Sequence, residues 1–402
     1  MAILSTGRKP INTFERASRL SLLVLTIMSL GPTFAAAASF RGLAALPGSS
    51  TGVFGNLGSR AHGISGDGSI VVGVSPTTVD EPGTAAVRWH SRTGAIARIE
   101  DPTGALAPSE AFAASHDGSI VVGDAGRRDQ GFRWSGEDGS VLGLRDPSSG
   151  LTNTRASAVS SDGSTIVGFG TRDTRREAFR WDAANGLQGL GSLAIGSFGW
   201  GVNGDGSVVV GETGSSFGIE AFRWTADDGM RGLGGIFAGT NISYATGVSP
   251  DGYFLIGAAG IPGGQVAFRW LPWTGFQPLG DLESAGNSMF SQANAISADG
   301  QVVVGSRGAG PARAFIWDPV RGIRALDVVL AQLGIDLSGW TINDATGISA
   351  DGLTIVGNGF HNGRQEAWVA VIPEPSTALL LGIGIGALAI RPKGEAPAVA
   401  HS

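Results

Sequence analysis

The sequence predicts an all-β fold, a seven-bladed β-propeller, and three observations support this prediction. A ten-residue pattern recurs seven times, as in ISGDGSIVVG from Ile64 and VNGDGSVVVG from Val202. Each copy is followed by an aromatic strand pattern such as AFRW, GFRW or AVRW. A column of small residues accompanies every copy. Repeated units of about 40 residues, each holding four short strand patterns, are typical of propeller blades.

Each repeat carries an Asp-Gly pair between two apolar runs. Glycine accepts the positive φ that a tight hairpin needs, and a Ser or Asn two residues before the aspartate can hydrogen-bond the turn. We therefore expect this hairpin to join the first and second strands of every blade. The seven aspartates are Asp67, Asp117, Asp162, Asp205, Asp251, Asp299 and Asp351.

The position four residues before each of these aspartates is always Gly or Ala. Small side chains suit an innermost strand, because blades converge near the axis of a closed ring. An open β-solenoid would not require such a strict column, so the pattern favours the ring. The column consists of Gly63, Ala113, Ala158, Gly201, Gly247, Ala295 and Gly347.

The third strand of each blade alternates aromatic residues with arginine, which places the two kinds on opposite faces. A ring of arginines could line an anion-binding channel, but Ile316 and Val369 replace arginine in two blades. We expect these side chains to lie inside or between blades, stacked on aromatic rings or paired with a turn aspartate. They are Arg88, Arg133, Arg180, Arg223 and Arg269.

The two ends of the repeat region predict how the ring closes. The last unit runs through EAWVAV to Pro373 and lacks a fourth strand. The segment SFRGLAAL from Ser39 matches the fourth-strand pattern GMRGLGGI from Gly229. We predict that residues 39–47 complete the blade formed by residues 344–371, which closes the ring in a chain without cysteine. The apolar segment near residue 330 predicts one or two helical turns outside the sheets.

The N-terminus has the order of a secretory signal peptide. Basic residues precede an apolar run from Leu20 to Leu30, and Ala36-x-Ala38 offers a cleavage site. An uncleaved membrane helix is the alternative, but the apolar run is too short to span a bilayer comfortably. We expect residues 1–38 to be removed and the mature chain to start at Ser39. The net charge of −6 indicates no nucleic-acid partner.

The repeats resemble the extracellular HAF repeat family, whose units combine a His/x-Ala-Phe-x-Trp strand with Ile-Ser-x-Asp-Gly-x-x-Val-Val-Gly. The resemblance covers essentially all of residues 39–371, although Glu177, Glu220 or Val266 stands where the family has histidine. It implies an extracellular context and no particular chemistry.

The C-terminal segment, residues 372–393, resembles a PEP-CTERM sorting signal. It contains Pro373-Glu374-Pro375, an apolar run from Ala378 to Ile390, and then Arg391 and Lys393. A helix of that apolar length rises roughly 20 Å, short of a hydrocarbon core about 30 Å thick. A tail, residues 394–402, follows where such proteins usually stop.

This second resemblance implies a partner, the transpeptidase-like protease exosortase of Gram-negative bacteria that make exopolysaccharide. It also implies export across the inner membrane, transient membrane insertion of the segment, and delivery to the cell surface or extracellular matrix. The alternative is a marginal membrane anchor that is never cut.

No motif indicates a cofactor, a metal site or a catalytic nucleophile. The chain has five His and no Cys, and its Gly-rich stretches lack the lysine of a phosphate-binding loop. One aspartate per turn is too few for a calcium loop. We therefore expect a non-catalytic protein without cofactor or metal.

The binding candidates lie where the repeats differ. Loops between blades, and those between second and third strands, open on one face of a propeller, and here they are irregular. At this ring mouth we expect aromatic, charged and amide side chains that would suit a glycan or a peptide loop. A surface under little constraint is the alternative. The candidates are Arg60, His62, Glu110, Phe112, Arg155, Phe198, Trp200, Tyr244, Gln292, Asn294 and Asp344.

The predicted function is binding of matrix or surface polysaccharide, or of an envelope protein. The rival hypothesis is a propeller-type glycan lyase or hydrolase, which needs two carboxylates, or a His with a Tyr or Arg, at the mouth. Its members would come from Glu110, Asp344, His62 and Tyr244. A passive coat protein is the third possibility.

Overall fold

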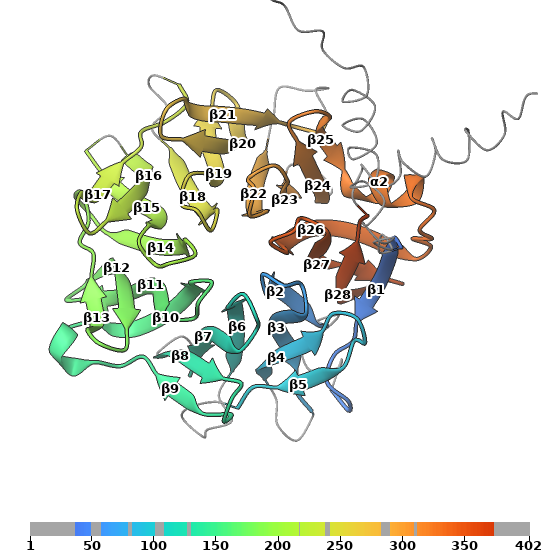
Figure 1. The fold of residues 1–402 in the computed structure, drawn as a ribbon, viewed down its shortest axis with the longest axis horizontal. Helices are drawn as coiled ribbons and strands as arrows, with labels where there is room; N and C mark the ends of the chain where they lie inside the picture. Colours follow the sequence, from blue (N-terminus) through green and yellow to red (C-terminus); the bar gives the residue numbers. More distant parts are fainter. Residues whose placement is uncertain are drawn as a thin grey trace, which may run out of the picture. The chain divides into compact units, whose positions relative to one another are not determined.

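The computed structural model describes residues 37–49, 58–78, 83–100, 108–126, 130–216, 218–237, 242–282, 290–308 and 312–373. Residues 37–372 form a compact unit in which seven antiparallel four-stranded sheets surround a central axis as blades (Figure 1). The fold is the predicted seven-bladed β-propeller. Ala36 of the predicted cleavage site and the sorting segment from Glu374 onward lie outside the described residues.

In each of the first six blades the strands follow chain order from the channel outward (Figure 1). Blade 1 comprises β2 (Arg60–Ile64), β3 (Ile70–Pro76), β4 (Thr84–His90) and β5 (Ile96–Arg98). Blade 2 comprises β6 (Ser109–Ala114), β7 (Ile120–Ala125), β8 (Gln130–Ser135) and β9 (Val141–Gly143). Blade 3 comprises β10 (Thr152–Val159), β11 (Thr165–Arg172), β12 (Arg175–Asp182) and β13 (Gly186–Gly189).

The second half of the ring repeats this order. Blade 4 comprises β14 (Ser197–Val202), β15 (Val209–Ser215), β16 (Gly218–Thr225) and β17 (Gly229–Gly232). Blade 5 comprises β18 (Ser243–Val248), β19 (Leu255–Ile261), β20 (Gly264–Leu271) and β21 (Gly275–Gly280). Blade 6 comprises β22 (Ser291–Ile296), β23 (Val303–Arg307), β24 (Arg313–Asp318) and β25 (Gly322–Ala325). Blade 7 comprises β26 (Trp340–Ile348), β27 (Thr354–His361), β28 (Arg364–Val371) and β1 (Ser39–Leu43).

The ring closes as predicted, with the N-terminal strand as the outermost strand of the last blade. β1 pairs antiparallel with β28, and Ser39 lies opposite Val371. Ser59, just before β2, donates a hydrogen bond to the Leu43 carbonyl and accepts one from the Ala367 N–H. Both ends of the propeller are thereby tied to blade 1.

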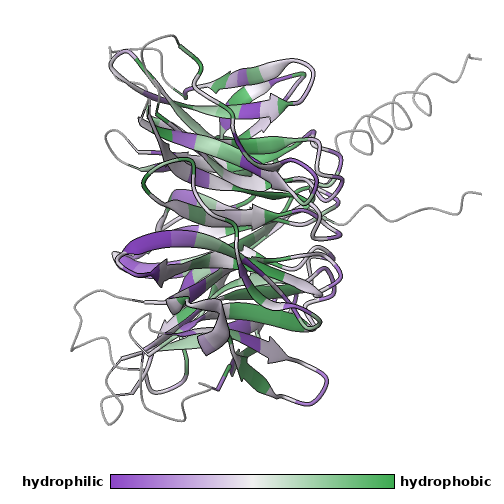
Figure 2. Cartoon of the chain, turned by 90° about the vertical axis from the view of Figure 1, so that its left-hand side faces the viewer, coloured by the Kyte–Doolittle hydropathy of each residue, from purple (hydrophilic) through white to green (hydrophobic). Residues whose placement is uncertain are grey.

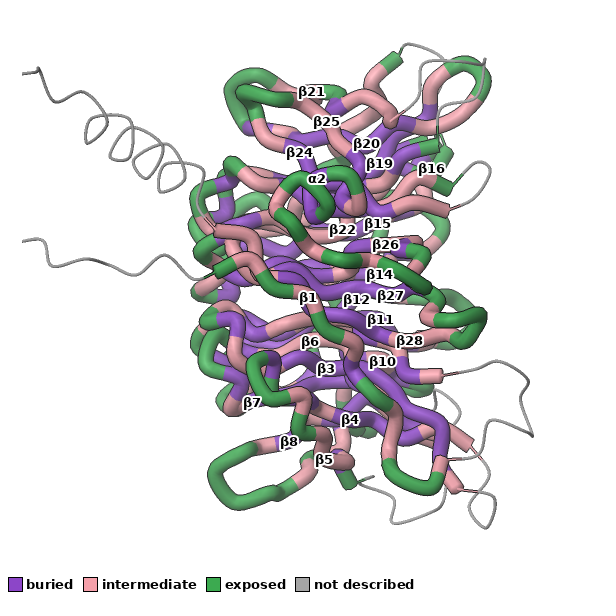
Figure 3. Tube along the Cα trace, turned by 90° about the vertical axis from the view of Figure 1, so that its right-hand side faces the viewer, coloured by how far each residue is buried: buried purple, intermediate pink, exposed green. Residues whose placement is uncertain are grey.

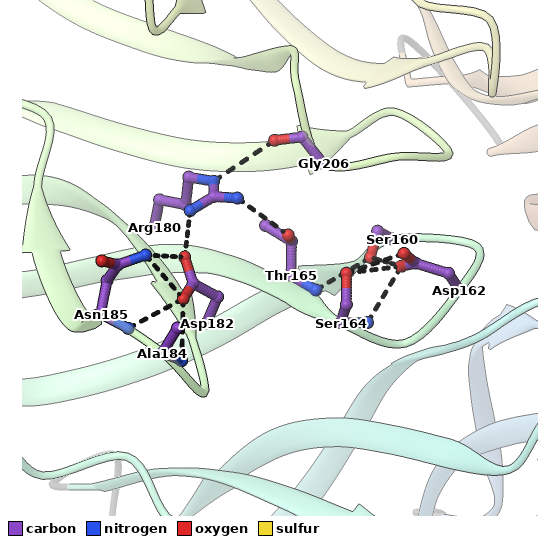
Figure 4. Close-up of polar contacts among 9 residues, drawn as sticks. All are labelled: Ser160, Asp162, Ser164, Thr165, Arg180, Asp182, Ala184, Asn185 and Gly206. Atoms are coloured by element: carbon purple, nitrogen blue, oxygen red, sulfur yellow. Dashed lines mark hydrogen bonds and ion pairs between the residues drawn. The ribbon is translucent and has the colours of Figure 1, made fainter.

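The Asp-Gly turns have the predicted geometry, and Figure 4 shows the one in blade 3. Asp162 accepts hydrogen bonds from the Ser160 hydroxyl and from the backbone N–H of Ser164. The Ser160 hydroxyl in turn accepts the N–H of Thr165 at 2.9 Å. Gly163 has a φ of 73°, the left-handed conformation that the turn requires.

Three of the five repeated arginines bridge neighbouring blades, as expected for a structural role. Arg88 of β4 lies over the Trp134 ring of blade 2, 4.8 Å from its centroid. Arg180 of β12 pairs with Asp182 and donates to the Gly206 carbonyl of blade 4 (Figure 4). Arg269 of β20 donates to the Gly300 carbonyl in blade 6.

The hydrophobic core lies between adjacent blades. Ile256 and Ala267 of blade 5, for example, cluster with Val303 and Phe315 of blade 6. Figure 2 shows hydrophobic colour concentrated along the strands, and Figure 3 shows that the central parts of the strands are buried while the turns are exposed.

The predicted helical turns are α2 (Leu326–Gln332), whose Leu326 and Leu330 are fully buried beside blades 6 and 7. A short 3₁₀ helix, η1 (Pro147–Ser149), precedes blade 3.

Candidate functional site

The innermost strands line a channel that widens on the face opposite the Asp-Gly turns. A cavity of about 550 Å³ occupies this mouth, and the narrower space behind it has a volume of about 260 Å³. All seven members of the Gly and Ala column line the narrower part, which explains why the position accepts only small residues. The mouth is lined by His62, Glu110, Phe112, Arg155, Ser157, Trp200, Glu212, Tyr244, Thr246, Gln292 and Thr346.

Seven of the predicted binding residues line this mouth, and the other four do not. Asn294 lines only the narrower part of the channel. Arg60, Phe198 and Asp344 lie on the same innermost strands but are absent from the lining of both cavities. The structure therefore brings eight of the eleven candidates together along the channel.

A β-bulge in the innermost strand of every blade aims one side chain at the channel. In blade 4 the pairing runs from Gly199↔Gly211 to Gly201↔Val210, which leaves Trp200 as the extra residue. Bulges are a usual device for redirecting a side chain. The equivalent bulged residues of the other blades are His62, Phe112, Ser157, Thr246, Asn294 and Thr346.

The glycine that ends each ten-residue repeat makes this bulge possible. A Cβ atom on Gly211 would lie 1.9 Å from the carbonyl oxygen of Phe198, and one on Gly257 would lie 2.0 Å from that of Tyr244. No side chain can be accommodated at such a distance. The same close approach, 1.8 to 2.0 Å, recurs at Gly73, Gly123, Gly168, Gly305 and Gly357.

One sector of the mouth, from blade 1 to blade 3, is charged but internally neutralised. Arg60 forms an ion pair with Glu110 at 3.3 Å. Arg155 lies over the ring of Phe112, 3.9 Å from its centroid, and its Nε is 3.8 Å from a carboxylate oxygen of Asp124. These acidic and basic groups are thus partnered within the protein.

His62 and three other bulged residues fasten neighbouring blades together. His62 Nδ1 lies 3.0 Å from the Ala111 carbonyl oxygen, and the imidazole stacks on the ring of Phe112. Burial lowers the pKa of His62, against the raising effect of Glu110. Thr246 donates in the same way to the Ala293 carbonyl at 2.7 Å. Four of the seven bulged side chains therefore stabilise the wall of the channel by linking adjacent blades.

Asp344 lies at the junction of blades 7 and 1. Its carboxylate accepts the backbone N–H of Asn358 at 2.8 Å, and the Asn358 side chain pairs with both backbone groups of Ala61. Burial raises the pKa of Asp344 to about 6, against the lowering effects of that hydrogen bond and of Arg60. The hydrolase hypothesis names two carboxylates, Glu110 and Asp344. They belong to blades 2 and 7, which are not adjacent, and Arg60 lies on the innermost strand of blade 1 between them.

The opposite sector, from blade 4 to blade 6, is aromatic and amide-rich. Trp200 stacks parallel to Phe198, with ring centroids 5.8 Å apart. The hydroxyl of Tyr244 donates to the Gln292 side-chain oxygen at 3.1 Å, and Gln292 donates to Asn294 at 3.1 Å. Asn294 completes this chain by donating to the Ala345 carbonyl.

Glu212 is a mouth residue that the sequence reasoning missed. It follows Gly211 in β15 and pairs in register with Phe198. Burial raises the pKa of Glu212, and a hydrogen bond from Trp200 opposes that shift. The signal was present in the sequence, because the residue after the repeat glycine faces the mouth residue of the neighbouring strand. The equivalent positions hold Val74, Asp124, Phe169, Ala258, Ser306 and Asn358.

The described ranges contain no group of three or more His, Cys, Asp or Glu placed to hold a metal ion. Within the same ranges no helix is long and apolar enough to cross a membrane. The mouth can offer ring faces for stacking, amide and hydroxyl groups for hydrogen bonding, and one carboxylate at the aromatic side. Concave sites of 300–1,000 Å³ with this mixture are typical of small-ligand pockets.

The fold and the site together define a seven-bladed β-propeller with a cavity, large enough for a small ligand, at the mouth of its channel. No protein-family model and no curated protein sequence matches the chain. An oligogalacturonate lyase solved in complex with manganese aligns with a TM-score of 0.53 and 12% identity, over 84% of this chain and 97% of that one.

Two other solved structures also align with the chain. Puromycin hydrolase aligns with a TM-score of 0.52 and 17% identity, over 80% of this chain and 55% of that one. TolB from Acinetobacter baumannii aligns with a TM-score of 0.46 and 13% identity, over 77% of this chain and 65% of that one. The chain thus spans about half of puromycin hydrolase and just under two thirds of that TolB. At these identities the likeness to the lyase and to puromycin hydrolase shows the propeller fold alone.

Proposed function

We propose that this chain is a non-catalytic binding propeller that recognises a polysaccharide at the mouth of its channel. The observation that carries the proposal is the cavity of about 550 Å³, walled on one side by Trp200 and Tyr244 and bordered by Gln292. The apolar face of a sugar ring packs against an aromatic side chain, while its hydroxyls need donors and acceptors around the ring. This sector of the mouth supplies both.

The polar groups at the mouth retain capacity to bind hydroxyls. The Tyr244 hydroxyl donates to Gln292 and can still accept a hydrogen bond. The Gln292 amide donates one N–H to Asn294 and retains a second. The wall is preorganised by these contacts, which reduces the entropy lost when a ligand binds.

The setting that we propose is extracellular. The order of residues at the N-terminus supports export by a signal peptide. The sequence resemblances support sorting by exosortase and a final location at the cell surface or in the matrix of a Gram-negative bacterium. Exopolysaccharide would then be the ligand within reach. Intact mass of the protein from the host's surface fraction should show a chain ending near Pro375, whereas a mass still including Arg391 would contradict the sorting step.

The proposal is tested by titrating the purified protein with exopolysaccharide isolated from its host. Wild-type protein should bind saturably. A Trp200→Ala/Tyr244→Ala double variant should lose most of this binding, because both ring faces are removed. Far-ultraviolet circular dichroism and the thermal midpoint establish whether the variant is folded.

A matched control uses the exposed aromatic pair on the opposite face of the ring. Tyr253 and Trp273 lie in the turns of blade 5, are 52% and 65% exposed, and have ring centroids 5.8 Å apart. A Tyr253→Ala/Trp273→Ala variant should bind like wild type. Equal loss in both double variants, or no binding by wild type, would refute a glycan site at the mouth and favour an envelope-protein partner or a coat role.

A glycan lyase or hydrolase is the second candidate, and the raised pKa of Glu212 at the cavity wall favours it. A protonated carboxyl group is what a general acid requires. Against this candidate, no described ion pair joins Glu212 to a second titratable group that could act as the general base. Release of reducing ends or unsaturated products from the bound polysaccharide, lost in Glu212→Gln, would establish catalysis.

A further inference from the structure

Among the described residues that line the mouth of the channel, Glu212 is the acidic side chain without an ionic partner. Glu110 is paired with Arg60, and Arg155 with Asp124. Glu212 forms no ion pair with any described residue, and no nearby cation contributes to its pKa. Burial makes this carboxylate costly to ionise, so a cation from outside the protein would stabilise it.

Two aromatic residues stand beside this carboxylate in the cavity wall. Glu212 lies in register opposite Phe198, whose ring stacks on that of Trp200 with centroids 5.8 Å apart. Burial raises the pKa of the Glu212 carboxyl against the lowering effect of the Trp200 side chain, and burial and the Glu212 charge raise the pKa of the Tyr244 hydroxyl. All three side chains line the same cavity. A cation over the face of a Trp or Tyr ring is attracted by the ring's quadrupole, and a carboxylate adds a direct charge partner.

We propose that Glu212, Trp200 and Tyr244 form a subsite for a protonated amine, and that the ligand is a polysaccharide containing 2-amino sugar units with a free ammonium group. This inference rests on the proposed glycan-binding function and specifies its ligand class. An ammonium group brings three N–H donors to the Glu212 carboxylate.

The neighbouring amide residues favour an amino sugar over a lysine side chain. Gln292 and the Tyr244 hydroxyl, in hydrogen-bond contact with each other at 3.1 Å, border the same cavity. They can bond to ring hydroxyls, which a lysine side chain lacks. The charged sector across the mouth is neutralised, so it does not repel an ammonium ligand.

The test compares two probes with the same sugar backbone, a tetramer of β-1,4-linked glucosamine, whose amino groups carry charge, and its fully N-acetylated counterpart, whose amide groups are neutral. Titration calorimetry with the full-length protein is run at a pH between the pKa of the carboxyl and that of the sugar amine. Wild type should bind the charged tetramer at least about tenfold more tightly. Glu212→Gln should abolish most of this preference, while Glu137→Gln, an exposed glutamate in the β8–β9 turn, should retain it.

A measurement on wild type alone guards against a misfolded variant. Raising the salt concentration should weaken binding of the charged tetramer and leave the acetylated one nearly unchanged, because only the former uses a charge pair. Equal affinity for both tetramers would overturn the ammonium subsite while leaving glycan binding intact. Binding of neither tetramer would overturn this ligand class, and the host exopolysaccharide titration then decides separately whether the mouth binds glycans. Tighter binding of a lysine peptide than of the glucosamine tetramer would overturn the sugar assignment.

Discussion

Replacing Leu43 with alanine tests whether the N-terminal strand holds the ring closed. Leu43 lies at the end of β1, is fully buried, and packs in one cluster with Val369 of blade 7 and with Val71 and Trp89 of blade 1. The indole N–H of Trp89 also donates to the carbonyl of Ala44 at 2.8 Å. The side chain therefore seals the junction between the last blade and the first.

The expected cost follows from the buried volume. Leu43→Ala removes three carbon atoms from a closed cluster, which costs about 2.4 kcal/mol at about 0.8 kcal/mol per buried methylene. The cavity left behind adds a further contribution, giving about 3–4 kcal/mol in total. Urea unfolding followed by tryptophan fluorescence measures the loss.

A leucine on another outermost strand supplies the control. Leu142 of β9 is 48% exposed, so Leu142→Ala should cost less than about 1 kcal/mol. If the two variants lose the same stability within about 0.5 kcal/mol, β1 contributes little to closure and the argument for a clasped ring is wrong.

Three further predictions concern the blades. Ser243→Ala should cost about 2–3 kcal/mol in urea unfolding, because the buried Ala221 N–H and the Gly234 carbonyl both lose their partner; an unchanged midpoint would contradict this. Gly257→Ala should cost more than about 2 kcal/mol, since its Cβ would lie 2.0 Å from the Tyr244 carbonyl oxygen, and a wild-type thermal midpoint would refute that reading. Burial raises the pKa of Asp344 in the folded protein to about 6. The free energy of unfolding should therefore fall as the pH rises from about 4 to about 6, and the loss should be complete above that range. Relative to wild type, Asp344→Asn should gain about 3 kcal/mol between pH 4 and pH 7, and a difference independent of pH would contradict the assignment.

The architecture could be predicted from sequence because the same local signals recur in each blade. The Asp-Gly turn, the small column and the Phe-x-Trp strand are each weak alone, but seven copies at a regular spacing make one topology consistent. Even the closure of the ring followed from Phe40 and Gly42 matching Met230 and Gly232 in another blade, and in both blades this glycine faces the third-strand aromatic residue.

Two features escaped prediction because they depend on contacts between strands. In the sequence, the repeat glycine is only the last residue of a β-branched strand. The pairing of the first and second strands shows that the absence of a Cβ leaves space for a carbonyl group of the innermost strand. Six of the seven blades also have a Ser or Thr eight residues before the turn aspartate that bridges to the preceding blade, as Ser291 does between Ala267 and Gly280. These Ser and Thr residues can be seen in the sequence, but their role becomes clear only when two blades are in contact.

The candidate site was predicted in outline and missed in detail for the same reason. Position along the innermost strand identified Trp200, Tyr244 and Gln292, because these positions must approach the channel in any propeller. Glu212 comes from the second strand and reaches the mouth only because the bulge at Trp200 brings the two strands into this register. Arg60 is held by the Glu110 side chain of blade 2, and Asp344 by the backbone N–H of Asn358 in the neighbouring strand, and a one-dimensional pattern shows neither contact.

Hydroxyl-radical footprinting of the protein with and without its host's exopolysaccharide tests the central claim most directly. The method reads protection of individual side chains, and Trp200 and Tyr244 on the mouth can be compared with Tyr253 and Trp273 on the opposite face in the same sample. Glycan binding at the mouth predicts protection of the first pair and unchanged labelling of the second. Protection confined to Tyr253 and Trp273, or no protection at either face, would contradict the account.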